Sequence, residues 1–208
     1  MKKLVLTKIL CIGVILSDTA LASIGQFYLR GEIGANKIQD IKADGKKFSQ
    51  SNAALYGRGV GYYFLENLRT DLVVNFSNQE SKYSSNSASQ SNIKAKPKIT
   101  TLMLTGYVDL FDLSICEVFV GAGAGLSQIK NKVTQTMYNG TTTVTSASNT
   151  KNNLAYQLVT GVAAKLTPNI KADLAYIWKD LGTTKDTNFV QSMHYKGHNI
   201  TLGLRLDL

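Results

Sequence analysis

The final stretch of the chain alternates strictly between apolar and polar residues. It runs from Gly197 to Leu208 with the sequence GHNITLGLRLDL. Its apolar members are Ile200, Leu202, Leu204, Leu206 and Leu208. A two-residue period places alternate side chains on opposite faces of a β-strand, whereas the helical period would mix the two sets. The stretch therefore predicts a strand between two unlike environments, and we expect this strand to close against an earlier one.

The same alternation recurs through the chain and predicts about eight strands, each near the ~9 to 11 residues of a tilted membrane strand. The strands expected before the last are 25–36, 53–64, 69–78, 99–110, 117–129, 153–165 and 170–180. Long polar loops are expected at 37–52, 79–98, 130–152 and 181–196, with short turns between them. We therefore predict an all-β, eight-stranded antiparallel transmembrane β-barrel with four long extracellular loops and short periplasmic turns.

Residues 1–22 have the features of a secretory signal peptide. Two lysines precede an apolar core, and Ala20-Leu21-Ala22 forms a small-x-small cleavage site. This core is too short for a spanning helix, which needs about 20 apolar residues. We expect 23–208 to be the outer-membrane barrel. Cleavage removes three lysines and one aspartate from a chain of formal net charge +9, which leaves +7, and it leaves Cys116 as a lone, small apolar residue.

Alternation alone leaves open whether the apolar face points outward to lipid or inward, as in a soluble lipocalin-like barrel. The polar face carries charges of both signs: Arg30, Glu32, Arg58, Asp71, Lys171, Asp173 and Arg205. A small membrane barrel would bring these charges together in its lumen, where they must pair because unpaired buried charge is costly. Aromatic residues near predicted strand ends are typical of a membrane interface. These are Tyr63, Tyr156, Tyr176 and Trp178. We therefore favour the membrane barrel.

Four segments carry a resemblance to known proteins: GVGYYFLENLRTDLVVNFS (59–77), VFVGAGAGLS (118–127), AYQLVTGVAAKLTPNIKADLAYIWKDLG (155–182) and HNITLGLRL (198–206). They resemble the small outer-membrane barrels of the opacity and OmpA-like surface-antigen superfamily. Within that group the chain is most similar to the rickettsial adhesins, which bind the host serum protein vitronectin. The resemblance implies a surface antigen of the cell outer membrane whose exposed loops aid host-cell attachment or serum resistance. The chain departs from the group at Leu208, where such barrels commonly end in an aromatic residue.

An eight-stranded lumen is filled by side chains, so we expect function to lie in the loops. The loop lysines that are candidates for partner binding are Lys46, Lys47, Lys94, Lys96, Lys98, Lys130, Lys132 and Lys151. Their charge favours an acidic or sulfated host extracellular protein such as vitronectin. The alternative is that they keep the loops soluble or contact outer-membrane lipid and lipopolysaccharide. Nucleic acid is not expected, because no binding motif for it is found.

Two other functions stay open. A structural barrel or narrow pore would need no loop ligand. A lipid-acting outer-membrane enzyme would use His194 and His198, with Ser192 close to both in sequence. No acidic partner stands at a fixed spacing from these residues, so we expect a non-enzymatic protein without catalytic residues. Two histidines and one cysteine do not make a convincing metal site, and no cofactor is expected.

Overall fold

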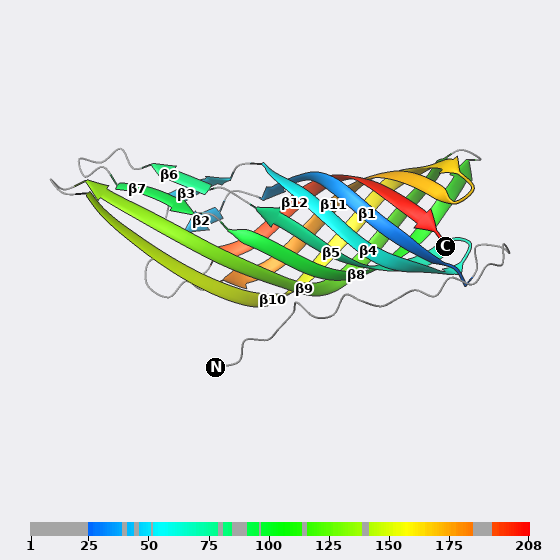
Figure 1. Cartoon of the computed structure of the whole chain (residues 1–208), viewed down its shortest axis with the longest axis horizontal. Helices are drawn as coiled ribbons and strands as arrows, with labels where there is room; N and C mark the ends of the chain where they lie inside the picture. The colour runs from blue at the N-terminus through cyan, green and yellow to red at the C-terminus, as the bar shows by residue number, and fades with distance from the viewer. Residues whose placement is uncertain are drawn as a thin grey trace.

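The computed structural model describes residues 25–38, 41–43, 46–50, 52–78, 81–84, 91–95, 97–113, 116–138, 142–184 and 193–208. They form an antiparallel β-barrel (Figure 1). The strands of its wall are β1 (Phe27–Ile38), β4 (Ala53–Leu65), β5 (Leu68–Asn78), β8 (Lys98–Leu113), β9 (Cys116–Tyr138), β10 (Thr142–Thr167), β11 (Ile170–Thr184) and β12 (Met193–Asp207). Four short strands lie outside the wall: β2 (Ile41–Ala43), β3 (Lys46–Gln50), β6 (Ser81–Ser84) and β7 (Ser91–Ala95).

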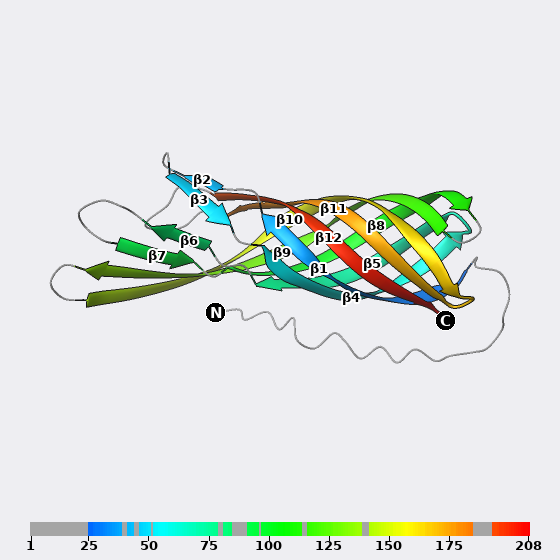
Figure 2. The ribbon, with the colours of Figure 1, turned by 90° about the horizontal axis from the view of Figure 1, so that it is seen from above.

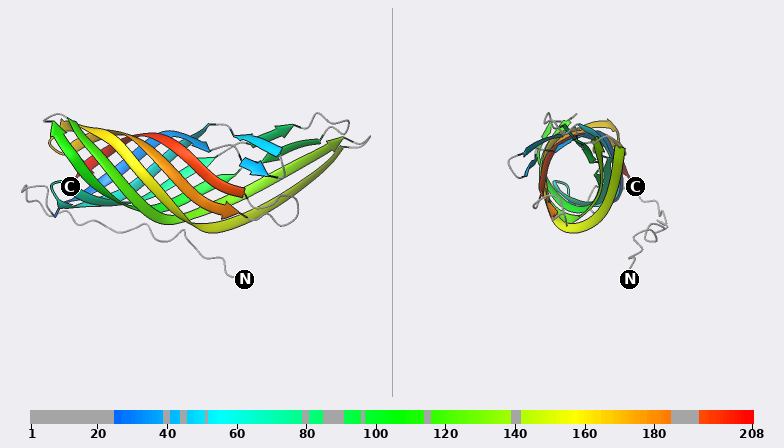
Figure 3. Two further views of the ribbon diagram at one scale, coloured as in Figure 1. Left: turned by 180° about the vertical axis from the view of Figure 1, so that it is seen from behind. Right: turned by 90° about the vertical axis from the view of Figure 1, so that its left-hand side faces the viewer.

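The barrel closes between its first and last wall strands, as the alternation of the final stretch predicted. β12 pairs with β1 in antiparallel register, with Tyr28 opposite Asp207 and Ile38 opposite Gly197. β10 pairs with both β9 and β11, so every wall strand has a partner on each side. Seen end on, the wall strands form a ring (Figure 3). A closed ring leaves no unpaired strand edge in the wall, which is the condition for a sheet to cross a membrane.

The wall has an apolar outer face and a polar inner face. On β12, Ile200 is 59% exposed, whereas the next residue, Thr201, is completely buried. Each wall strand exposes large apolar side chains, for example Leu29, Val60, Leu72, Leu104, Val120, Leu158, Leu174 and Leu202. A soluble barrel would place its polar face outside. An apolar outer face and a polar inner face fit a barrel that is surrounded by lipid. This confirms the membrane barrel over the lipocalin-like alternative.

The connections between wall strands differ in length at the two ends of the barrel. At one end, two residues separate each of the pairs β4 and β5, β8 and β9, and β10 and β11. At the other end, 39–52, 79–97 and 185–192 join the remaining neighbours, and the β9–β10 hairpin projects from the same end. Outer-membrane barrels keep their short turns in the periplasm and their long connections outside. The end with the long connections is therefore the extracellular end.

The third long connection is not a loop, although the sequence predicts one over 130–152. β9 continues to Tyr138 and β10 begins at Thr142, so the pair forms a hairpin that rises beyond the barrel rim (Figures 1 and 2). β7 pairs with β9 along this hairpin, and β6, β3 and β2 continue the sheet. The segment is rich in threonine, whose β-branched side chain favours strands. Its polarity indicates a solvated hairpin rather than an irregular loop.

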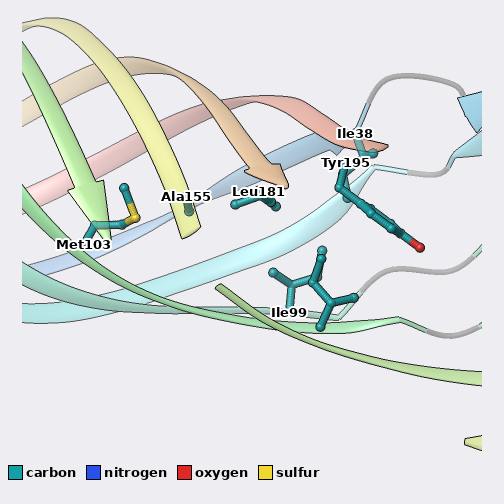
Figure 4. Close-up of a cluster of buried hydrophobic side chains, with 7 residues drawn as sticks. Ile38, Ile99, Met103, Ala155, Leu181 and Tyr195 are labelled. Carbon is teal, nitrogen blue, oxygen red and sulfur yellow. The ribbon is translucent and has the colours of Figure 1, made fainter. Parts of the chain in front are cut away.

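An apolar cluster fills the lumen near the extracellular end. Its members are Ile38, Ile99, Met103, Ile129, Ala155, Leu181 and Tyr195, all at most 4% exposed. They come from six different wall strands and point toward one another across the lumen (Figure 4). This cluster separates the polar interior of the barrel from the extracellular side.

The predicted signal peptide, residues 1–22, lies outside the described residues and stays a prediction. Within the described ranges, no helix has the length and apolarity needed to cross a membrane.

Candidate functional site

A charge network occupies the lumen, with Arg30 of β1 at its centre. The Arg30 Nη2 lies 2.9 Å from Asp173 Oδ1 on β11 and 3.1 Å from Glu32 Oε2. The Arg30 Nε lies 3.7 Å from Asp71 Oδ2 on β5. All four side chains are at most 3% exposed. One buried guanidinium therefore compensates carboxylates from three different strands, which ties these strands together across the lumen.

A second group extends the network toward the periplasmic end. The Arg205 Nε lies 3.5 Å from Asp173 Oδ2, and its Nη2 lies 3.8 Å from Glu117 Oε2. The Lys171 Nζ lies 3.1 Å from Glu117 Oε1. Asp173 thus bridges the two arginines. The structure places six of the predicted lumen residues inside the barrel: Arg30, Glu32, Asp71, Lys171, Asp173 and Arg205.

Sequence reasoning missed further charges in the lumen. Arg69 is completely buried, with its guanidinium carbon 4.1 Å from the centroid of the Tyr107 ring and its Nε 3.4 Å from Asp109 Oδ1. Lys179 and Glu117 are also buried. Strand periodicity could have found them, because Arg69 lies two residues before Asp71 and therefore on the same face.

Glycines on the inner face make room for the large lumen side chains. A Cβ on Gly161 would lie 2.5 Å from Phe119 Cζ, and one on Gly61 would overlap the Tyr28 ring. Beside Lys179 the interior holds a cavity of about 10 Å³, which is room for no more than one water molecule. Around these described residues the lumen is packed in the manner of a core, which leaves the outer surfaces as the place for a ligand.

β4 has the opposite phase to the one that the sequence predicted. Arg58 is not in the lumen but on the exposed outer face, between Tyr56 and Val60 along the strand. Tyr63, expected at the membrane interface, is instead 1% exposed inside the barrel. The prediction failed because alternate residues of this strand are glycines, which give no hydrophobic pattern. Neighbouring side chains decide the phase, since Asn75 and Tyr28 occupy the space inward of the glycines. Tyr156 and Tyr176 do lie on the outer face, as predicted.

The candidate lysines lie at the extracellular end where the structure describes them. Lys98 and Lys130 are exposed and stand directly opposite each other on β8 and β9, and Lys151 is exposed on β10. For four others only the backbone is described: Lys46 and Lys47 in β3, Lys94 in β7 and Lys132 in β9. Lys96 lies outside the described residues. Like charges on opposed strand positions repel each other, so an anion between Lys98 and Lys130 would be favourable.

The histidines lie on the outer wall of the β11–β12 pair, and one of them has an acidic partner that the sequence did not reveal. His194 Nε2 lies 2.7 Å from Asp180 Oδ1, and His194 Nδ1 lies 3.3 Å from Thr183 Oγ1. His198 Nδ1 lies 2.5 Å from the Tyr176 hydroxyl. Ser192, the hydroxyl that the sequence offered, lies outside the described residues.

The described residues offer no metal centre, since no group of three or more His, Cys, Asp or Glu side chains among them is placed to hold an ion. Cys116, at the start of β9, is a free thiol of intermediate exposure.

Relatives of known name share the whole length of the chain. A protein of Rickettsia bellii (strain RML369-C) is 38% identical over 229 residues that cover all of both chains. A protein of Rickettsia rickettsii (strain Sheila Smith) is 35% identical over 228 residues, again over the full length of both. Both carry the name "Putative adhesin".

Solved outer-membrane proteins share the fold at low sequence identity. Neisserial surface protein A covers 86% of this chain and 96% of its own, with a TM-score of 0.54 and 15% identity. Ail of Yersinia pestis, solved with the heparin analogue sucrose octasulfate, covers 88% of this chain and 99% of its own, with a TM-score of 0.50 and 17% identity. The family model of the outer membrane protein beta-barrel domain matches residues 9–207. The chain therefore belongs to the family of outer-membrane β-barrel domain proteins, and its relatives place it at the outer-membrane surface.

Proposed function

We propose that this protein is a surface adhesin whose extracellular face binds an acidic or sulfated host extracellular protein, with vitronectin as the first candidate, and thereby aids host-cell attachment or serum resistance. The observation that carries the proposal is the cationic extracellular face. Lys98 of β8 and Lys130 of β9 are exposed and directly opposite each other, and Lys151 is exposed on β10.

Two further observations support a function at this end. The apolar cluster and the charge network fill the lumen, so the barrel itself serves as a platform. The β9–β10 hairpin carries a sheet of additional strands outward from the rim, and this sheet offers a surface that a barrel with short connections would lack (Figure 2). The relatives' name agrees with such a role.

Binding of the refolded full chain to immobilised vitronectin tests the proposal, with sucrose octasulfate as a competitor because it is the ligand solved with Ail. Replacing Lys98, Lys130 and Lys151 together by glutamine is expected to weaken binding roughly tenfold, since each exposed charge contributes about 0.5 kcal/mol. The matched control is Lys165→Gln at the periplasmic end, which should leave binding unchanged. Equal binding by the triple variant and the wild type would contradict the proposal.

The alternative of a structural barrel or narrow pore predicts neither vitronectin binding nor competition by a sulfated sugar. Planar bilayer recordings distinguish a structural barrel from a narrow pore, because a pore gives discrete conductance steps and a packed lumen gives none.

A further inference from the structure

A β-bulge near the extracellular end of β11 changes which residues face outward. The register of β11 against β12 shifts between Asp180 and Thr183. Leu181 between them points into the lumen and is 3% exposed. Gly182 has a φ of 82°, a backbone conformation that glycine adopts readily. In a regular strand, residues three apart lie on opposite faces. The bulge instead brings Asp180 and Thr183 to the same outer face.

His194 of β12 stands between these two side chains. The Asp180 carboxylate Oδ1 accepts a hydrogen bond from the Gly182 N–H at 3.0 Å and contacts His194 Nε2 at 2.7 Å. Because a carboxylate can only accept, the His194 Nε2 carries the proton. In the neutral imidazole, Nδ1 is then an acceptor, and it lies 3.3 Å from the Thr183 hydroxyl. A hydroxyl, an imidazole base and a carboxylate that orients the base are thus aligned.

The surroundings of these three residues fit a lipid substrate. His194 is 49% exposed, so molecules outside the barrel can reach it. On the membrane side, Trp178 and Tyr176 continue the outward row of β11 and form an apolar surface. The Lys196 ammonium lies 3.6 Å from Asp180 Oδ2 and is 43% exposed, so it can meet a phosphate group. Along the wall from the extracellular end, the Thr183 hydroxyl comes first, the Lys196 cation comes next and the aromatic surface follows. An acyl chain on the aromatic surface and an anionic group at Lys196 would therefore both lie beside the hydroxyl.

We propose that Thr183, His194 and Asp180 form an esterase site on the outer wall, which hydrolyses ester-linked acyl chains of anionic lipids in the outer leaflet. The Thr183 Oγ1 attacks the ester carbonyl carbon while His194 Nδ1 takes the hydroxyl proton. The carbon–oxygen bond to the alcohol breaks, and His194 returns the proton to the leaving oxygen. Water then attacks the threonyl ester, His194 accepts a proton from the water, and this proton goes back to Thr183 Oγ1. The sum is one water consumed and one fatty acid and one alcohol released.

The catalytic residues are Thr183 and His194, because they meet the reacting atoms. Asp180 is a positioning residue that acts through His194. This activity goes beyond host binding and uses another part of the molecule, since Lys98 and Lys130 lie on β8 and β9.

Fatty-acid release by the refolded full chain tests the site, using vesicles of phosphatidylglycerol alone and vesicles that also contain lipopolysaccharide. The wild type is expected to release fatty acid, and the vesicle type shows whether the ester belongs to phospholipid or to lipopolysaccharide. Thr183→Ala and His194→Ala should each lower the rate by roughly 100-fold or more. Thr183→Ser keeps a hydroxyl and should retain activity. A heat-dependent shift in gel mobility shows that each variant has folded.

Asp180→Asn needs a measurement that a structural role would not affect. It should lower kcat with little change in KM, because the base loses its orientation while the lipid surface stays the same. Asp180→Glu keeps a carboxylate and should recover part of the rate. The matched control is Thr160→Ala, which removes another exposed threonine of the outer wall and should leave the rate unchanged. No release from either vesicle type by the folded wild type would overturn the proposal, as would equal release by Thr183→Ala.

Discussion

Two arginines on neighbouring strands have very different surroundings on the inner and outer faces of the barrel wall. Arg30 of β1 points into the lumen, where carboxylates of Glu32, Asp71 and Asp173 surround it. Arg58 of β4 points outward, and its cross-strand neighbours are Gly31 and Val74, neither of which can pair with it. The inner face is therefore a matched set of charges, whereas Arg58 on the outer face stands between the apolar side chains of Tyr56 and Val60. Arginine should therefore stabilise the barrel at position 30 in the lumen and destabilise it at position 58 on the outer face.

The largest effect is expected inside. Arg30→Ala removes the arginine partner of the buried Glu32 and Asp71 carboxylates, whereas Asp173 keeps Arg205. The free energy of unfolding should therefore fall by about 3 to 5 kcal/mol. Urea unfolding of the barrel in lipid vesicles measures this change. A loss below about 1 kcal/mol would mean that the lumen charges find other partners or water.

On the outer wall, removing an arginine should increase the free energy of unfolding instead of lowering it. Arg58→Leu removes a charge from the lipid-facing surface, and it should raise the free energy of unfolding by up to about 2 to 4 kcal/mol. The same vesicle unfolding assay applies, with Val60→Leu as a control that keeps the face apolar. A destabilised Arg58→Leu variant would show that Arg58 has a partner in the membrane.

A change of volume tests the packed lumen without changing charge. Gly161→Val would bring a Cβ within 2.5 Å of Phe119 Cζ and of the Leu174 carbonyl oxygen. Overpacking of this kind should cost about 1 to 3 kcal/mol of unfolding free energy. Gly106→Val on the outer face is the matched control, since nothing lies within 4 Å of the Cβ position there. Equal losses for both would indicate a backbone effect rather than a filled lumen.

The smallest effect on stability is expected at the extracellular rim. Lys98→Gln removes an exposed charge, so the unfolding free energy should change by no more than about 0.5 kcal/mol. Thermal or urea unfolding checks this. A larger change would assign the lysine a structural role and would weaken the case for host binding.

The sequence predicted the barrel because apolar and polar residues alternate visibly in most strands, as at Leu204 and Arg205. The assignment of residues to the inner or outer face failed where the sequence shows no such alternation of polarity. In β4 the glycines hide the phase, so Arg58 and Tyr63 were both assigned to the wrong face. The pairing of His194 with Asp180 could not be predicted either, since it depends on a register shift that a single strand's pattern does not contain.

Composition alone could not predict the structure of the threonine-rich segment. Threonine is common both in solvent-exposed loops and in strands, so the structure depends on the pairing of β9 with β10 and with β7.

The hairpin of β9 and β10 also sets a distance. From Lys130 to Tyr138 the strand advances by about 3.3 Å per residue, so this part of β9 is roughly 25 Å long. It can therefore act as a spacer that holds a bound surface away from the bilayer. Because side chains alternate with a period of two, removing residues in matched pairs would shorten this reach without turning any side chain to the other face.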